Sequence, residues 1–186
     1  MINPGEEIVG EYLKLIKNCD FVEYNLYTPD IQGEIDVVGI NAKEKVLYVC
    51  EVATHLITGL QYTKNNRPDN VDRFCKKFRK NIPYARKYFP DYTHHFMIWS
   101  PVVKSSGDSA KNNQLKSLSE VVETIFAEFS ERIETVINHS YAHCLFELRA
   151  YAAKETKELQ SPIMRLMQIE EYTKKHNALL IKKGIE

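Results

Sequence analysis

Two acidic residues are the first candidates for chemistry, because each interrupts an apolar run of β-forming residues. Asp36 lies within residues 33–40, and Glu51 lies within residues 46–54, a run apolar enough for a strand buried on both faces. Side chains alternate along a strand, so neighbouring strands can point both carboxylates into one space. A divalent cation such as Mg²⁺, which prefers oxygen ligands, would relieve their repulsion. The alternative is that each acid is solvated or held in an ordinary ion pair.

The segments that must position these acids predict a sheet joined to helices. The first three strands are connected too tightly for crossover helices, so we expect an antiparallel meander, with a fourth strand added after a helix. The helix after residue 69 has one apolar stripe, and Pro83 is expected to interrupt it, with a short continuation to Phe89. The expected elements, in order, are a helix over 5–18, strands over 20–28, 33–40 and 46–54, a helix from about 69, and a strand over 93–103.

Beyond residue 115 the pattern is helical only. The apolar spacing from Leu115 to Ile137 predicts one long amphipathic helix, residues 140–159 read as a second, and Ser161-Pro162 starts a third. We therefore predict an α/β (α+β) fold with a core over residues 1–110. Residues 111–186 would form a helical C-terminal extension that packs on the core or on a partner, including a second copy in a homodimer.

The motifs around the acids resemble the PD-(D/E)xK nuclease superfamily. Residues 33–36 read G-E-I-D, a hairpin follows, and Glu51-Val52 then provides the E-V of the next strand. The closest resemblance is to the YraN-like endonucleases, and a more distant one is to archaeal-type Holliday-junction resolvases. In the YraN-like pattern a first helix carries G-E, as Gly10-Glu11 does here, and the next strand carries E-R-N, which Glu23-Tyr24-Asn25 matches in part.

The resemblance implies a restriction-endonuclease-like αβββαβ core with a mixed central sheet, and Mg²⁺- or Mn²⁺-dependent hydrolysis of DNA. Asp36 and Glu51 would hold the metal, with the backbone carbonyl of Val52 as a further ligand, and Glu11 would act through water or orient the site. The metal would polarise a phosphodiester and lower the pKa of an attacking water. The family's lysine would position that water and offset the charge of the transition state.

The chain departs from the family pattern at Ala53, which stands where the family carries the lysine of its E-x-K motif. A methyl group can neither position water nor offset charge. In one interpretation a cation reaches the site from elsewhere, the candidates being Lys76, Lys77, Lys64 and His55. In the other, the site is degenerate, and the protein binds nucleic acid or mediates assembly without cleavage. The presence of Glu11, Asp36 and Glu51 together favours the enzyme.

A basic segment accompanies the acids. Residues 64–87 hold nine basic and two acidic residues, in a chain whose net charge is zero. We expect a basic face beside the carboxylates and an acidic helix elsewhere, with phosphate contacts from Lys64, Arg67, Arg73, Arg79 and Lys80. Three tyrosines, Tyr62, Tyr84 and Tyr88, would stack on unpaired bases. The alternative is an ordinary solvated helix face whose tyrosines pack their rings.

Composition excludes several other classes of protein. With 44% hydrophobic residues among 186, the chain can build a core, and its zero net charge excludes a wholly basic coat. No apolar run approaches about 18 residues, and the amino-terminal residues have no secretory pattern, so we expect a cytoplasmic protein without a membrane partner. The four cysteines are widely spaced and form no CxxC, which favours free thiols over a zinc finger or a disulfide scaffold.

Overall fold

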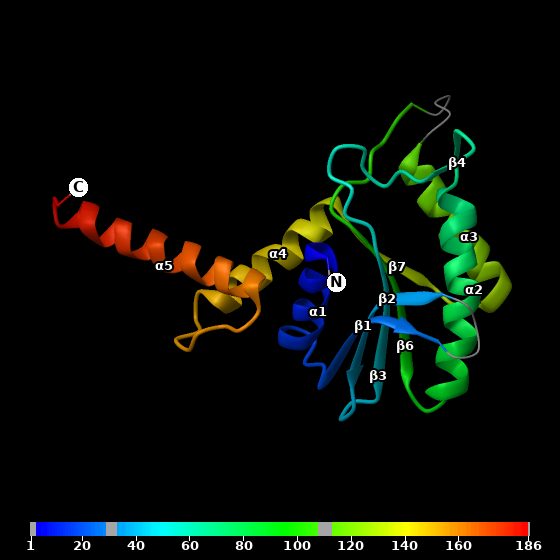
Figure 1. Ribbon diagram of the computed structural model, residues 1–186, viewed down its shortest axis with the longest axis horizontal. Helices are drawn as coiled ribbons and strands as arrows, with labels where there is room; N and C mark the ends of the chain where they lie inside the picture. The colour runs from blue at the N-terminus through cyan, green and yellow to red at the C-terminus, as the bar shows by residue number, and fades with distance from the viewer. Residues whose placement is uncertain (1–2, 29–32, 108–112, 186) are drawn as a thin grey trace.

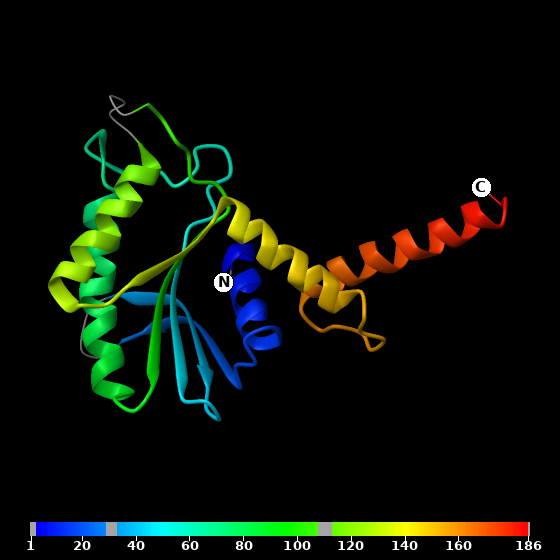
Figure 2. The ribbon, with the colours of Figure 1, turned by 180° about the vertical axis from the view of Figure 1, so that it is seen from behind.

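A mixed five-stranded sheet covered by helices on both faces forms the body of the molecule (Figures 1 and 2). The computed structural model describes residues 3–28, 33–107 and 113–185. The sheet has the strand order β1-β2-β3-β6-β7, and β4 and β5 form a separate small hairpin. The strands are β1 (Phe21–Tyr27), β2 (Glu34–Asn41), β3 (Val46–Val52), β4 (Thr63–Lys64), β5 (Arg67–Pro68), β6 (Thr93–Ser100) and β7 (Ile133–Ile137). The helices are α1 (Pro4–Leu15), α2 (Asn70–Tyr88), α3 (Gln114–Phe129), α4 (Asn138–Ala152) and α5 (Pro162–Lys182).

The predicted meander is confirmed. β1 pairs antiparallel with β2, and β2 pairs antiparallel with β3, whereas β6 is parallel to β3. The parallel pairing follows from the long connection through α2, which carries the chain back to the end of the sheet at which β3 begins. The α+β fold with a mixed central sheet is therefore as the sequence predicted.

The prediction that the chain is only helical after residue 115 is wrong. Helix α3 ends at Phe129, because Ser130 adopts a left-handed backbone with φ of 58°, and β7 then pairs parallel with β6. The apolar spacing from Phe129 through Ile133 to Ile137 fits a helix, but the β-branched residues of Ile133–Ile137 also favour a strand. Pairing of Ile133 with β6 and its burial in the cluster that includes Phe78 and Ile125 select the strand, so residues 111–186 are not a purely helical extension.

Pro83 does not interrupt α2, contrary to expectation. The helix runs unbroken over Asn70–Tyr88, with Pro83 inside it. A proline removes one backbone hydrogen bond from a helix, but here the residues on either side are held by packing. Ile82 and Ala85 are fully buried against the sheet, which offsets that loss. α4 also differs, since it ends at Ala152 rather than at residue 159.

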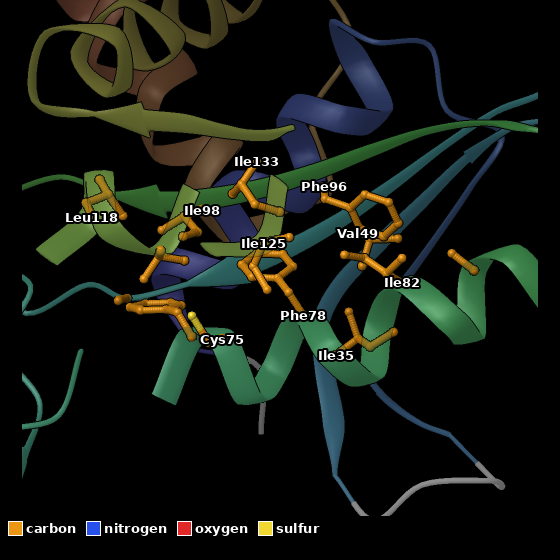
Figure 3. Close-up of a cluster of buried hydrophobic side chains, with 14 of the residues drawn as sticks. Ile35, Val49, Cys75, Phe78, Ile82, Phe96, Ile98, Leu118, Ile125 and Ile133 are labelled. Carbon is orange, nitrogen blue, oxygen red and sulfur yellow. The ribbon is translucent and has the colours of Figure 1, made fainter. Parts of the chain in front are cut away.

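Two hydrophobic clusters lie on the two faces of the sheet. The first joins the sheet to α2 and α3, and its centre includes Phe78, Ile82, Phe96 and Ile125 (Figure 3). The second joins the sheet to α1, α4 and α5 and includes Leu13, Trp99, Leu148 and Met164. Because β3 lies in the middle of the sheet, these clusters exclude water from both of its faces.

Helix α5 extends away from this body as an arm (Figures 1 and 2). Met164 and Met167 near its start are buried in the second cluster, whereas nearly every residue from Tyr172 onward is exposed. None of the described helices is long and apolar enough to cross a membrane.

Candidate functional site

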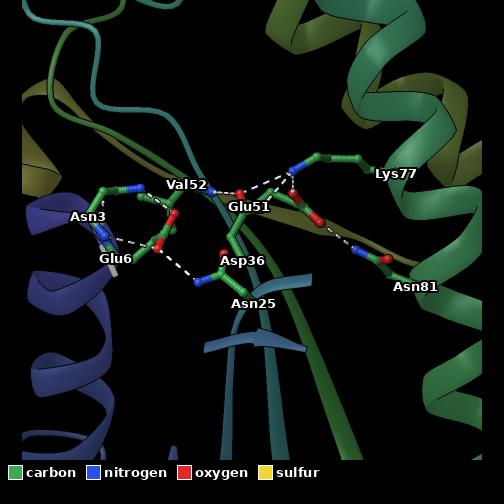
Figure 4. A network of polar contacts seen from close by, with 8 residues as sticks. All are labelled: Asn3, Glu6, Asn25, Asp36, Glu51, Val52, Lys77 and Asn81. Carbon is green, nitrogen blue, oxygen red and sulfur yellow. Dashed lines mark hydrogen bonds and ion pairs between the residues drawn. The ribbon is translucent and has the colours of Figure 1, made fainter. Parts of the chain in front are cut away.

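Strands β2 and β3 bring the two predicted acids together. Val37 pairs with Cys50 and Val38 pairs with Val49, so continuing the register by one residue places Asp36 opposite Glu51. Both side chains point toward α2, where they share one cation (Figure 4). Glu51 is fully buried and Asp36 is 7% exposed. The convergence that the sequence predicted from strand alternation is therefore present in the structure.

Lys77 on α2 supplies the cation between the two acids. Its Nζ lies 2.9 Å from Oδ1 and 3.1 Å from Oδ2 of Asp36, and it also contacts Oε2 of Glu51. Lys76, the neighbouring candidate, lies about 100° further around the helix and is exposed. Ala53, where the family carries its lysine, is 2% exposed and belongs to the cluster that joins the sheet to α2.

Two further donors fix the orientation of the carboxylates. The backbone N–H of Val52 donates to Oδ2 of Asp36 at 2.8 Å, and Nδ2 of Asn81 donates to Oε1 of Glu51 at 2.7 Å. Asn81 was not among the residues that sequence reasoning selected. The available signal was its spacing, because residues four apart share a helix face and Asn81 follows Lys77 by four positions on α2.

The electrostatics of the group reflect two buried acids that share a single cation. The pKa of Glu51 is raised to about 8, chiefly by burial and next by the negative charge of Asp36, while Lys77 and Asn81 oppose the shift. Burial lowers the pKa of Lys77, but Glu51 and Asp36 together outweigh this effect and raise that pKa above its usual value. With all three groups ionised, one negative charge remains uncompensated.

The donor set fits a divalent cation of the Mg²⁺ type. It offers carboxyl oxygens from Asp36 and Glu51, and once Glu51 is ionised one negative charge is left that Lys77 does not compensate. Mg²⁺ commonly takes one or two carboxylates, with water and phosphate as its other ligands. Among residues 3–28, 33–107 and 113–185, no three His, Cys, Asp or Glu side chains gather into one metal-holding group. The protein would therefore contribute two side-chain ligands and leave the remaining positions to the backbone, water and substrate.

The structure does not bring Glu11 to this group. Glu11 lines a surface depression with Cys19, Asp20 and the first half of β1. Burial raises the pKa of Glu11, Lys14 opposes that shift, and Glu7 adds to it. The depression lies toward Phe21, whereas Asp36 lies opposite the other half of β1. Glu11 therefore has a local environment that is separate from the Asp36–Glu51–Lys77 group.

A different acid from α1 approaches the site. Glu6 is 8% exposed and forms a capping box with Asn3 at the start of α1. Its Oε2 accepts a hydrogen bond from Nδ2 of Asn25 at 3.4 Å, and Asn25 lies across from Asp36, between two paired residues of β1 (Figure 4). The Asn-x-x-Glu spacing is a sequence signature of a helix start, so from the sequence Glu6 is expected to cap α1 and not to belong to a functional site.

The basic segment is partly neutralised, which corrects the expectation of an acidic helix elsewhere. α3 packs beside α2, and Arg79 forms a two-pronged ion pair with Glu128, with Nε to Oε2 at 2.8 Å. Arg86 likewise bonds Glu131, in the connection between α3 and β7, at 2.8 Å. Arg79 is therefore committed to a partner within the chain.

The other predicted phosphate contacts lie at different places. Lys64 and Arg67 are exposed on the small β4–β5 hairpin. Arg73 is exposed and its guanidinium lies 4.1 Å from the centre of the Tyr62 ring. Lys80 is half-buried near Gly33, where an added Cβ would come within 2.2 Å of the lysine Nζ.

The three tyrosines already have ring partners within the chain. Tyr62 packs against His55 and Phe74, with ring centres 5.1 and 5.9 Å away. Tyr84 and Tyr88 contact each other, with ring centres 4.8 Å apart. His55, one of the candidate cations, is thus engaged with an aromatic ring, and β3 ends three residues before it. Stacking of these tyrosines on bases stays a prediction.

Comparisons of the chain with protein-family models, with curated proteins and with solved structures found no match.

Proposed function

We propose that the chain is a metal-dependent nuclease that hydrolyses DNA phosphodiester bonds at the group formed by Asp36, Glu51 and Lys77. The observation that carries this proposal is the position of Lys77, whose Nζ contacts both carboxylates from α2. Lys77 therefore supplies, from a helix, the positive charge that the family's lysine would supply from the position of Ala53. The resemblance of the G-E-I-D and E-V segments to PD-(D/E)xK nucleases supports the same reading.

The residues of the site have separate roles in this proposal. Asp36, Glu51 and the backbone carbonyl of Val52 would hold Mg²⁺ or Mn²⁺, which when bound would polarise a phosphodiester and lower the pKa of an attacking water. Lys77 keeps its proton because both acids raise its pKa, so it can offset the negative charge that builds on the phosphate. The Val52 N–H and Asn81 hold the carboxylates in place before substrate arrives.

DNA is the proposed substrate because exposed cations accompany the acids. Lys64, Arg67 and Arg73 carry positive charge on or beside the hairpin that precedes α2, the helix that delivers Lys77. Such residues bind phosphates without reading sequence. A cytoplasmic location is part of the same proposal, and the four cysteines, Cys19, Cys50, Cys75 and Cys144, support it because all are buried and free.

One observation favours a second candidate, a module that binds nucleic acid or mediates assembly without cleaving it. The contacts from Lys77, Val52 and Asn81 already satisfy both carboxylates of Asp36 and Glu51. A saturated network of this kind can serve as a structural ion pair. Cleavage then distinguishes the two candidates, because a module would retain DNA binding and show no turnover.

The test uses purified protein with supercoiled plasmid and with single-stranded DNA, in Mg²⁺, in Mn²⁺ and in EDTA. Asp36→Asn preserves the size of the side chain and removes its charge, and the exposed Glu44→Gln is the matched control. The nuclease proposal expects metal-dependent cleavage that Asp36→Asn abolishes and Glu44→Gln retains. Salt-sensitive binding without cleavage would support the module, and absence of both would contradict both candidates.

A further inference from the structure

The loop between β3 and β4, residues 53–62, holds two adjacent aliphatic side chains out into solvent. Ile57 is 89% exposed and Leu56 is 67% exposed. No other large hydrophobic side chain in the part of the chain that the structure describes is as exposed as Ile57. A single exposed aliphatic residue is ordinary on a protein surface, whereas two in succession form an apolar tip that water solvates poorly. We call Leu56 and Ile57 the apolar tip.

Buried polar groups hold this loop in place. Nδ2 of Asn70 donates to the carbonyl oxygen of Leu60 at 2.7 Å, and Nε2 of Gln114 donates to that of Thr58 at 2.8 Å. Both amide side chains are only 2% exposed, and Leu60 is itself fully buried. Because breaking these contacts would leave buried polar groups without partners, the loop cannot easily fold its apolar tip back onto the body. The exposure of the tip is therefore built into the fold.

The apolar tip belongs to the end of the sheet that carries the acid pair. β3 ends at Val52, one residue after Glu51, and the loop begins directly afterwards. Leu56 follows Glu51 by five positions, so their Cα atoms are at most about 18 Å apart. Figures 1 and 2 show the loop running over the end of the sheet at which β3 ends, with the β4–β5 hairpin following it. A ligand that spans the acids can therefore also reach the tip.

The segments around the apolar tip are positively charged. Residues 53–68 meet residues 101–107 here, since the N–H of Leu60 donates to the carbonyl oxygen of Val102 at 2.9 Å. The two segments contain no Asp or Glu, and the first acid after them in the hairpin direction is Asp69, at the start of α2. Their cations are Lys64, Arg67 and Lys104. Nζ of Lys104 donates to the carbonyl oxygen of Ile57 at 2.6 Å, which places one cation directly beside the tip.

We infer that the apolar tip inserts between stacked bases of duplex DNA that lies across the acid pair. Aliphatic side chains such as leucine and isoleucine act as wedges that unstack a base step and kink the duplex, while neighbouring cations hold the phosphates. The inference rests on the proposed function for its ligand, and it adds that the substrate is double-stranded and is distorted on binding. Pyrimidine–purine steps such as TA unstack most easily, so we expect the tip to favour them.

An anionic lipid surface would also combine negative charge with an apolar interior. DNA is the better match because the tip shares its end of the sheet with Asp36, Glu51 and Lys77, a group that suits a phosphodiester and not an acyl chain. Vesicles therefore enter the experiments as the competing ligand.

The first test measures unstacking directly, with a duplex that carries 2-aminopurine at a central TA step. The protein is titrated in EDTA, so that cleavage cannot contribute to the signal. Saturation with wild-type protein should raise the fluorescence at least about twofold, because the base leaves the stack. The double variant Leu56→Ser with Ile57→Ser should lose this rise and bind at least about tenfold more weakly. An unchanged signal from this double variant would overturn the inference.

Two further variants separate insertion from other effects. Ile57→Met keeps a long apolar side chain and should retain the rise in fluorescence. Ile181→Ser is the matched control, because Ile181 is a 64% exposed aliphatic residue on α5, the arm that extends away from the body. Circular dichroism checks that all variants are folded. Loss of the signal in Ile57→Met or in Ile181→Ser, with the fold intact, would contradict a wedge at the tip.

The second test asks what covers the tip. The four native cysteines are buried, so a thiol introduced by Ile57→Cys is the one that reacts with a maleimide. Saturating duplex DNA should slow this reaction at least about tenfold, whereas Ile181→Cys should react at an unchanged rate. Vesicles of phosphatidylserine and phosphatidylcholine are tested in parallel. Protection by vesicles alone, or by neither ligand, would overturn the inference.

The cleavage assay with Mg²⁺ separates failure of this inference from failure of the proposed function. Cleavage of duplex DNA without a change in 2-aminopurine fluorescence would refute insertion and leave the nuclease proposal standing. A rise in fluorescence that depends on Leu56 and Ile57, without cleavage, would support insertion and contradict the nuclease. Absence of any binding to the duplex would contradict both.

Discussion

The ammonium nitrogen of Lys77 lies 2.9 Å from Oδ1 of Asp36, although 41 positions of sequence separate the two residues. The contact exists because α2 returns across the sheet between β3 and the parallel β6, which brings the middle of the helix over the acids of β2 and β3. The chemical character of the site therefore depends on how one helix docks on one face of the sheet.

Replacing Lys77 should abolish cleavage and destabilise the fold, whereas replacing Lys76 should do neither. Lys77→Met leaves Asp36 and Glu51 without their cation, which for a buried pair is expected to lower the free energy of unfolding by roughly 3–5 kcal/mol. Lys76→Met removes an exposed charge and should change that free energy by less than about 0.5 kcal/mol. Urea unfolding at pH 8 and plasmid cleavage provide the measurements. Equal effects of the two variants would exclude Lys77 as the cation of the site.

Asn81 should contribute to stability through Glu51. Asn81→Leu removes the donor to Oε1 of a fully buried carboxylate, so we expect a loss of about 1–3 kcal/mol in the free energy of unfolding. In a Glu51→Leu background the same substitution should be nearly neutral, because no carboxylate is left unsatisfied. A double-mutant cycle by urea unfolding measures the coupling. If the two substitutions prove additive, the hydrogen bond does not stabilise the protein.

The stability of the metal-free protein should fall as pH rises from about 5 to about 8. The pKa of Glu51 is raised from 4.5 to about 8 on folding, so in this window the folded state holds a proton that the unfolded state has released. Stability from this group is thus present at low pH and is lost as Glu51 ionises. Lys77, whose pKa is raised above 10.5, stays charged in both states over the same window.

The measurement is urea unfolding in EDTA at a series of pH values, comparing wild type with Glu51→Gln. The variant cannot ionise at this position, so its stability should change less across the window. Parallel pH curves for the two proteins would show that Glu51 titrates alike in the folded and unfolded states.

Arg73 and Arg79 should differ in their contribution to DNA binding. Arg73 is exposed beside the β4–β5 hairpin, whereas the charge of Arg79 is already paired with Glu128. Arg73→Ala should therefore lower the slope of log affinity against log salt by about one. Arg79→Ala should change it less. Fluorescence anisotropy with labelled duplex DNA at several salt concentrations measures both slopes. A larger change of slope for Arg79→Ala than for Arg73→Ala would contradict this prediction and would indicate that DNA binds on the α2–α3 side.

The parts of the site predicted from sequence are those that local geometry determines. Asp36 and Glu51 converge because the alternation of strand side chains and a short hairpin fix their register. Lys77 was one of several candidate cations, since choosing among them requires the docking of α2, which depends on contacts distant in sequence. Glu11 was selected by its place in a motif, but the acid of α1 that bonds Asn25, the residue across from Asp36, is Glu6.

The wrong predictions about the fold also arise where contacts distant in sequence decide the structure. An apolar spacing of four residues fitted a helix through Ile137, and only the open edge of β6 makes Ile133–Ile137 a strand. Pro83 reads as a break because its lost hydrogen bond is local, whereas the packing of Ile82 that offsets the loss is not. In both cases tertiary contacts outweigh a local preference.

The burial of Ala53 restricts how this protein could be re-engineered. Because that methyl group fills space between the sheet and α2, a long side chain introduced there would press on the helix that carries Lys77. Moving the lysine back to the strand therefore requires two coupled changes, Ala53→Lys and a small residue at position 77. Ala53→Lys alone would leave two lysines beside the acids, and replacement of Lys77 alone would leave none. The position of the lysine on the helix is therefore difficult to change by single substitutions.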